Sequence, residues 1–140
     1  MITPSNNDIK GMHWQVYKKL RKSLRDHCFV AAKGGSKGNS ISPAFLVISR
    51  NSAKTMDWDN VYGGLKPLLD CLVQPSSANP DGLGYIVNDD VTNMPYPPYV
   101  IQGKAPPGKG SMTVKIYRLD LNHSESDLGL PINWLGGGAA

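Results

Sequence analysis

Two pairs of aspartates in the central part of the chain have the residue type and spacing for binding a divalent cation. Asp57 and Asp59 lie two residues apart, and in extended backbone such side chains point to the same side. Asp89 and Asp90 follow a short apolar stretch, where a strand is expected to end. Clustered carboxylates attract hard cations such as Mg²⁺ through oxygen ligands. A cation held in this way stabilises phosphoryl transfer, because it polarises the phosphate, activates water and neutralises the leaving oxygen.

A lysine and a further aspartate follow the first pair. If a helix begins at Asp59, Lys66 lies two turns later on the same face and points toward the carboxylates. A lysine in that position can bind a phosphate or stabilise developing negative charge. Asp70, one turn further, can hold Lys66 in place. The residues that share this face are Asp59, Gly63, Lys66 and Asp70.

Each of these features also has a purely structural interpretation. Asp59 or Asn60 can serve only as the N-cap of a helix, and the second aspartate pair can form a turn. An exposed Lys66–Asp70 pair contributes only a few tenths of a kcal/mol. The D-x-D motif is short and common. The combination favours a functional site, because all of these residues fall at the ends of predicted elements within one stretch of the chain.

Other common catalytic and metal-binding patterns do not fit this sequence. A calcium loop counted from Asp57 requires an oxygen ligand and then glycine at the positions that Val61 and Tyr62 occupy. The sequence has no P-loop, dinucleotide-binding or serine-nucleophile motif. Two distant cysteines, Cys28 and Cys71, make neither a zinc site nor a disulfide framework, so we expect reduced core thiols. The histidines, which lack ligand spacing, are His13, His27 and His123.

Positive charge is concentrated in the first 54 residues. This segment holds ten Lys or Arg and two acidic residues, for a net charge of +8, whereas the remainder holds five basic and nine acidic residues, net −4. A basic segment favours a polyanionic partner such as nucleic acid, although a solvated helix face gives the same signal. The candidate DNA contacts are Lys18, Lys19, Arg21, Lys22, Arg25 and Lys54.

Hydrophobic periodicity predicts two main helices. The first covers residues 12–27, with an apolar face formed by Trp14, Val16, Tyr17, Leu20 and Leu24. The second covers residues 60–73, with an apolar stripe formed by Val61, Leu65, Leu68 and Leu72. Gly63-Gly64 and Pro67 predict a kink near residues 63–67, because proline removes a donor and clashes with the preceding turn.

Short apolar runs predict about four strands, at residues 44–48, 84–87, 99–102 and 112–117. The Pro- and Gly-rich segment 106–110 is expected to join the last two as a hairpin, and residues 34–40 form a flexible loop by composition. We therefore expect an α+β (or α/β) fold in which a mixed sheet packs with the two helices. The expected domain covers residues 1–121, followed by a partly mobile tail, 122–140.

The composition excludes some classes of protein. No apolar run approaches the ~18 residues that a membrane span requires, and the first ten residues lack the apolar segment of a signal peptide. A hydrophobic content of 40% with 19% charged residues is typical of a globular domain. We expect a soluble cytoplasmic protein.

The order of the motifs resembles the RusA family of Holliday junction resolvases. Asp57-Trp58-Asp59-Asn60 leads into a helix with Lys66-Pro67-Leu68-Leu69-Asp70-Cys71-Leu72, and a loop then reaches Asp89-Asp90. Pro4-Ser5-Asn6-Asn7 near the N-terminus is also similar to the family pattern. The resemblance extends to about Leu119.

This resemblance implies a homodimeric endonuclease that depends on Mg²⁺ or Mn²⁺ and cuts four-way DNA junctions symmetrically, without a small-molecule cofactor or a membrane partner. It implies Asp57, Asp59, Asp90 and Lys66 as catalytic residues, and Asp89 as a further metal ligand. Asn60 and Asp70 are expected to support these groups. Many such proteins are encoded by bacteriophages, so their place of action includes the host cytoplasm.

The sequence also departs from the family pattern. The interval between Asp59 and Lys66 is three residues longer than in the founding pattern and includes Gly63-Gly64, and the arginine-rich run before Asp57 is reduced to Lys54. Two other functions therefore stay open. One is a non-catalytic module that binds junctions or other DNA, and the other is a metal-dependent enzyme that acts on a small phosphate ester.

Overall fold

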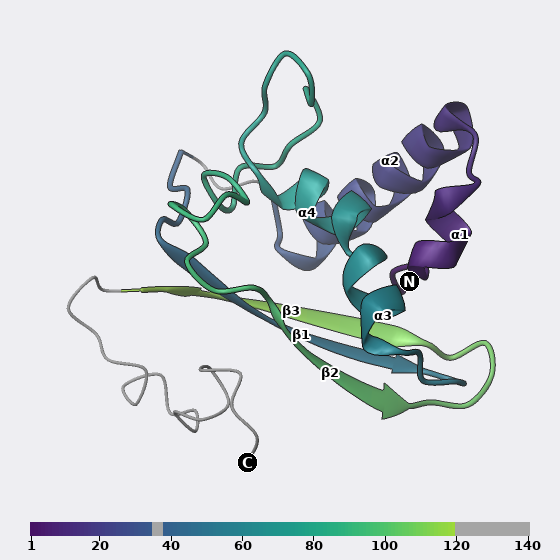
Figure 1. Ribbon diagram of the computed structural model, residues 1–140. Helices are drawn as coiled ribbons and strands as arrows, with labels where there is room; N and C mark the ends of the chain where they lie inside the picture. The colour runs from purple at the N-terminus through teal and green to yellow at the C-terminus, as the bar shows by residue number, and fades with distance from the viewer. Residues whose placement is uncertain (35–37, 120–140) are drawn as a thin grey trace.

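A computed structural model describes residues 1–34 and 38–119 of the chain, and these residues form one sheet with helices packed against one of its faces (Figure 1). This arrangement confirms the α+β class. The tail predicted at residues 122–140 and part of the loop predicted at 34–40 lie outside the described residues. The helices are α1 (Asn6–Lys10), α2 (Trp14–Ala31), α3 (Trp58–Gly63) and α4 (Lys66–Leu72), and the strands are β1 (Ala44–Ser52), β2 (Tyr99–Lys104) and β3 (Ser111–Arg118).

The sheet has the order β2-β1-β3, with β1 parallel to β2 and antiparallel to β3. Ile48 is paired with Val100 on one side and Val114 on the other. The hairpin predicted between residues 99–102 and 112–117 is therefore wrong, although both strands are present, as β2 and β3, and the sheet is mixed as expected. The apolar strand β1 takes the central position, where its residues are buried best. The segment that leads from β2 to β3 passes the end of β1, where the Ala105 N–H donates to the Ser52 carbonyl.

The fourth predicted strand, at residues 84–87, is also wrong. Among the described residues, Ile86 makes only isolated bridges, to Ile41 and to Val73. Ile86 is nevertheless fully buried. Its apolar character therefore reflects a place in the core and not a place in the sheet.

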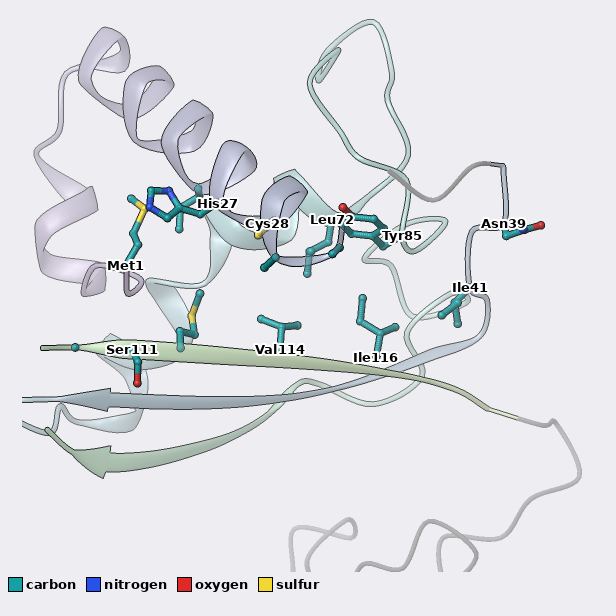
Figure 2. A pocket seen from close by; sticks show the side chains of 15 residues that line it. Met1, His27, Cys28, Asn39, Ile41, Leu72, Tyr85, Ser111, Val114 and Ile116 are labelled. Carbon is teal, nitrogen blue, oxygen red and sulfur yellow. The ribbon is translucent and has the colours of Figure 1, made fainter. Parts of the chain in front are cut away.

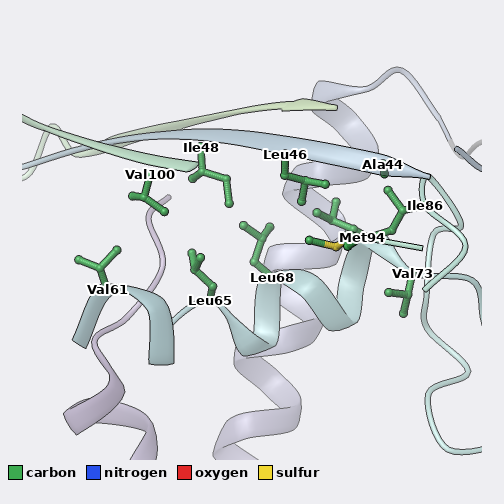
Figure 3. Close-up of a cluster of buried hydrophobic side chains, with 11 residues drawn as sticks. Ala44, Leu46, Ile48, Val61, Leu65, Leu68, Val73, Ile86, Met94 and Val100 are labelled. Carbon is green, nitrogen blue, oxygen red and sulfur yellow. The ribbon is translucent and has the colours of Figure 1, made fainter. Parts of the chain in front are cut away.

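The main core lies between β1 and the helices α3 and α4 (Figure 3). Every member of the stripe predicted on the second helix is at most 2% exposed, which confirms that prediction. Burial of each such side chain contributes about 1.5–3 kcal/mol. The cluster consists of Ala44, Leu46, Ile48, Val61, Leu65, Leu68, Leu72, Val73, Ile86, Met94 and Val100.

The second predicted helix is broken in the middle, as the glycines and the proline indicated. The helix α3 ends at Gly63 and α4 begins at Lys66, so the continuous helical face expected from Asp59 to Asp70 does not exist. A Cβ atom on Gly63 would collide with the Asn6 side chain, and one on Gly64 would collide with the Pro4 carbonyl. The two glycines therefore let the N-terminal segment pack directly against the break.

The first predicted helix extends further than expected and has a narrower buried face. Leu24 is 1% exposed, but Trp14 and Val16 are 60% and 53% exposed, so their assignment to the apolar face is wrong. The Tyr17 hydroxyl donates to Asp70 of α4, and the two exposed residues lie in the turn before Tyr17. No helix in the described part of the chain has both the length and the apolar character needed to span a membrane.

Candidate functional site

Lys66 is held between two aspartates that come from different parts of the chain. Its Nζ atom lies 2.8 Å from Asp70 Oδ1, within α4, and 3.7 Å from Asp89 Oδ2, in the segment before β2. The first contact confirms the predicted pairing of Lys66 with the aspartate one turn later. The Lys66 side chain is 60% exposed, so the ammonium group reaches both carboxylates while it stays accessible from solvent.

Asp70 is the least exposed member of this group and connects it to the basic helix α2. Its side chain is 15% exposed, and Oδ2 accepts a hydrogen bond of 3.0 Å from the Tyr17 hydroxyl. The guanidinium of Arg21 lies 4.0 Å from the same oxygen. The Asp70 backbone carbonyl accepts a further bond of 2.6 Å from Asn79 Nδ2. No local sequence pattern indicates the role of Tyr17, because the residue lies 53 positions away from Asp70.

These contacts change the proton affinity of the groups that make them. The hydrogen bond to Asp70 raises the pKa of Lys66, and the charge of Asp89 acts in the same direction, while partial burial opposes both. Burial and the neighbouring Asp70 charge raise the pKa of Tyr17 well above its usual range. Lys66 is therefore a cation and Tyr17 a neutral hydrogen-bond donor near neutral pH. A cationic lysine suits binding of a phosphate and not general-base catalysis.

The carboxylates of Asp57 and Asp59 lie at the start of α3. Asp57 occupies the N-cap position without a side-chain capping bond, and both residues are exposed. The capping role considered for Asp59 or Asn60 is therefore wrong. The segment before α3 is fixed by Gln102 of β2, whose side-chain amide accepts from the Met56 N–H and donates to the Met56 carbonyl, each at 2.8 Å.

The two residues of the second aspartate pair, Asp89 and Asp90, have different roles. Asp89 faces Lys66, whereas Asp90 organises a turn, because its Oδ1 accepts from both nitrogens of Asn93 at 2.9 and 2.8 Å. Its Oδ2 accepts from the Asn88 side chain at 2.9 Å. These bonds, led by the backbone N–H of Asn93, lower the pKa of Asp90. The turn interpretation therefore holds for Asp90, whose carboxylate is also exposed.

The predicted metal ligands provide the right chemistry without forming a closed site. Across residues 1–34 and 38–119, no three His, Cys, Asp or Glu side chains form a group that could hold a metal ion. Mg²⁺, however, is often held by one or two carboxylates together with water and substrate phosphates. The exposed carboxylates of the predicted ligands fit a site of this kind, in which water and substrate phosphates complete the coordination. The predicted ligands are Asp57, Asp59, Asp89 and Asp90.

The predicted DNA-contacting residues separate into exposed and internally bonded groups. Arg21 is turned toward Asp70 with 15% of its side chain exposed, and Arg25 donates to the Asp81 carbonyl at 3.0 Å. These two arginines therefore hold parts of the protein together. The exposed basic residues from the predicted set are Lys18, Lys19, Lys22 and Lys54.

A separate apolar cavity of about 510 Å³ lies between α2 and β3 (Figure 2). Leu24 and Cys28 line it from the helix, and Met112, Val114 and Ile116 line it from the strand. In the described residues, β3 is paired with β1 alone, so the strand that lines this cavity is an edge strand of the sheet. Its apolar lining does not suit phosphate but suits another apolar surface.

Comparisons with protein-family models, with curated proteins and with solved structures find no match to this chain. The resemblance to the RusA family therefore stays a prediction from the motifs.

Proposed function

We propose that the protein is a metal-dependent DNA endonuclease that cuts four-way junctions, as the motif order implies. The observation that carries the proposal is the position of Lys66. An accessible cation is held by Asp70 and by Asp89, so the structure joins the lysine motif to the second aspartate motif. In a merely exposed helical pair, Lys66 would have no partner outside its own helix.

In this proposal, Asp57 and Asp59, both exposed at the start of α3, would bind Mg²⁺ or Mn²⁺ together with water and the substrate phosphates. The bound ion supplies charge neutralisation and an activated water. The Lys66 ammonium group binds a non-bridging oxygen of the scissile phosphate and stabilises the charge that develops there. The exposed lysines of α2 bind neighbouring backbone phosphates, which positions the DNA without reading its sequence.

An exposed aromatic pair beside the first aspartates supports a nucleic-acid substrate. Trp58 lies between Asp57 and Asp59 and is 55% exposed, and its ring centroid lies 6.3 Å from that of Tyr62. Exposed aromatic rings stack on unpaired bases in a way that tolerates any sequence.

The test is cleavage of a labelled four-way junction by wild-type protein and by Asp57→Asn, with Mg²⁺ and with EDTA. We expect metal-dependent cutting by the wild type and at least a hundredfold slower cutting by Asp57→Asn, because a group acting in the transition state contributes roughly that factor. Asp81→Asn is the matched control, because among the described residues this exposed aspartate is bonded through its backbone carbonyl, to Arg25, and not through its side chain. Cutting by Asp57→Asn at the wild-type rate contradicts the assignment.

The break between α3 and α4 at Gly63-Gly64, which alters the spacing from Asp59 to Lys66, favours a second candidate function, a DNA-binding module without catalysis. This candidate predicts junction binding with no metal-dependent cleavage at any pH. Clean nicking at stoichiometric protein excludes it.

A further inference from the structure

We infer that Tyr17 is a positioning residue that fixes Lys66 through Asp70 and thereby couples the DNA-contacting helix α2 to the catalytic lysine. The inference rests on the proposed function for its catalytic consequence. Its structural part concerns only the contacts of these three side chains.

The Asp70 carboxylate has a separate donor for each of its oxygens. Lys66 contacts Oδ1 at 2.8 Å and the Tyr17 hydroxyl contacts Oδ2 at 3.0 Å. Rotation of the carboxylate would disturb both contacts at once. The Tyr17 bond to Oδ2 is shorter than the 4.0 Å contact of Arg21 with the same oxygen. Tyr17 therefore fixes the orientation of Oδ1, which is the atom that accepts the bond from the Lys66 ammonium.

Lys66 depends on this orientation because little else immobilises it. Its side chain is 60% exposed, and a lysine side chain loses rotamer entropy when it is held in one position. The second contact, to Asp89, is longer at 3.7 Å. The short bond to a 15%-exposed carboxylate therefore sets the position of the ammonium.

The same chain of contacts begins on the helix that carries the exposed lysines. Tyr17 precedes Lys18 and Lys19 in α2, and both lysines are exposed. When phosphates bind these lysines, they fix α2 relative to the DNA. Through Tyr17 and Asp70, that placement also fixes Lys66 relative to the scissile phosphate.

Tyr17→Phe removes one hydroxyl and keeps the ring. Tyr85→Phe is the matched control, because the Tyr85 hydroxyl also donates a part-buried bond, of 2.7 Å to the Gly34 carbonyl, beyond the other end of α2. At saturating junction and in a single turnover, we expect Tyr17→Phe to cut about tenfold more slowly with unchanged junction affinity. The reason is that misplacement of a catalytic group slows the chemical step without weakening substrate binding. Tyr85→Phe should cut at the wild-type rate. A loss of affinity with an unchanged rate at saturation overturns the inference.

A second measurement does not depend on nuclease activity. Hydrogen exchange of the Lys66 ammonium, followed by ¹⁵N NMR, reports how firmly the group is held. We expect several-fold faster exchange in Tyr17→Phe and no change in Tyr85→Phe. Exchange at the wild-type rate in Tyr17→Phe overturns the inference even if the protein is a nuclease. If the wild type cuts no DNA, the proposed function fails, while the NMR result still decides whether Tyr17 positions Lys66.

Discussion

At the level of single residues, the surroundings of Lys66 fix both its charge and its place. Two aspartates lie 2.8 and 3.7 Å from its ammonium group, and the hydrogen bond to Asp70 raises its pKa. A group with a raised folded-state pKa stabilises the fold below its unfolded value and loses that contribution as pH rises through the folded value. Lys66 is therefore protonated at neutral pH, and this contribution is lost when the lysine deprotonates in strongly alkaline solution.

Replacement of this lysine tests its proposed role on the phosphate. We expect Lys66→Met to cut a junction about 10²–10³-fold more slowly at saturation, because one donor aimed at the developing charge contributes that much. The rate should show no inflection from Lys66 between pH 6 and about pH 9, since the residue stays protonated throughout. Lys104→Met, at the end of β2, is the control and should keep its rate. An equal reduction in both variants contradicts the role of Lys66.

At the level of elements, the break between α3 and α4 is a packing site for the N-terminal segment. Arg50, which is 5% exposed on the core side of β1, donates to the Thr3 carbonyl at 2.9 and 3.3 Å. Ser5 and Asp8 form a capping box at the start of α1. These contacts bring Pro4 against Gly64 and give the N-terminal motif a structural role.

We expect Gly64→Ala to destabilise the protein through this contact. The backbone of Gly64 has φ −74° and ψ −9°, which alanine adopts freely, so the destabilisation comes from the collision with the Pro4 carbonyl. Overpacking of this kind costs about 1–3 kcal/mol, which urea unfolding measures. Gly11→Ala is the control, because a Cβ there meets nothing within 4 Å. Equal stability of the two variants contradicts the packing role of Gly64.

The helix α2 is expected to supply most of the electrostatic affinity for DNA. Replacing Lys18, Lys19 and Lys22 with Gln should weaken junction binding and reduce the slope of log K against log salt by about 0.9 for each phosphate that is no longer neutralised. The matched control replaces Lys104, Lys109 and Lys115, which are exposed in or beside β2 and β3. A larger reduction of the slope in the control places the DNA surface elsewhere.

At the level of the whole molecule, we expect a symmetric homodimer. A four-way junction has approximate two-fold symmetry, so two related active sites can cut opposed strands. Light scattering at micromolar concentration should give twice the subunit mass of 15.2 kDa. A monomer with and without junction DNA contradicts the dimer and favours a nickase or a binding module.

Features that depend on local spacing could be predicted from the amino-acid sequence alone. The stripe of Val61, Leu65, Leu68 and Leu72 is buried, the helix breaks near Gly63-Gly64, and Lys66 pairs with Asp70 one turn later. Each of these follows from residues within a few turns of one another, where helical geometry fixes the distances.

Which distant segments meet became clear only from the three-dimensional arrangement. The apolar runs of β2 and β3 could be recognised as strands in the sequence. The position of β1 between them could not be predicted, because a strand's partners depend on the packing of the whole core. The bonds from Tyr17 to Asp70 and from Lys66 to Asp89 also cross long intervals of chain. Trp14 and Val16 follow a helical period yet are exposed, because a period identifies a face and the neighbouring elements determine how much of it is covered.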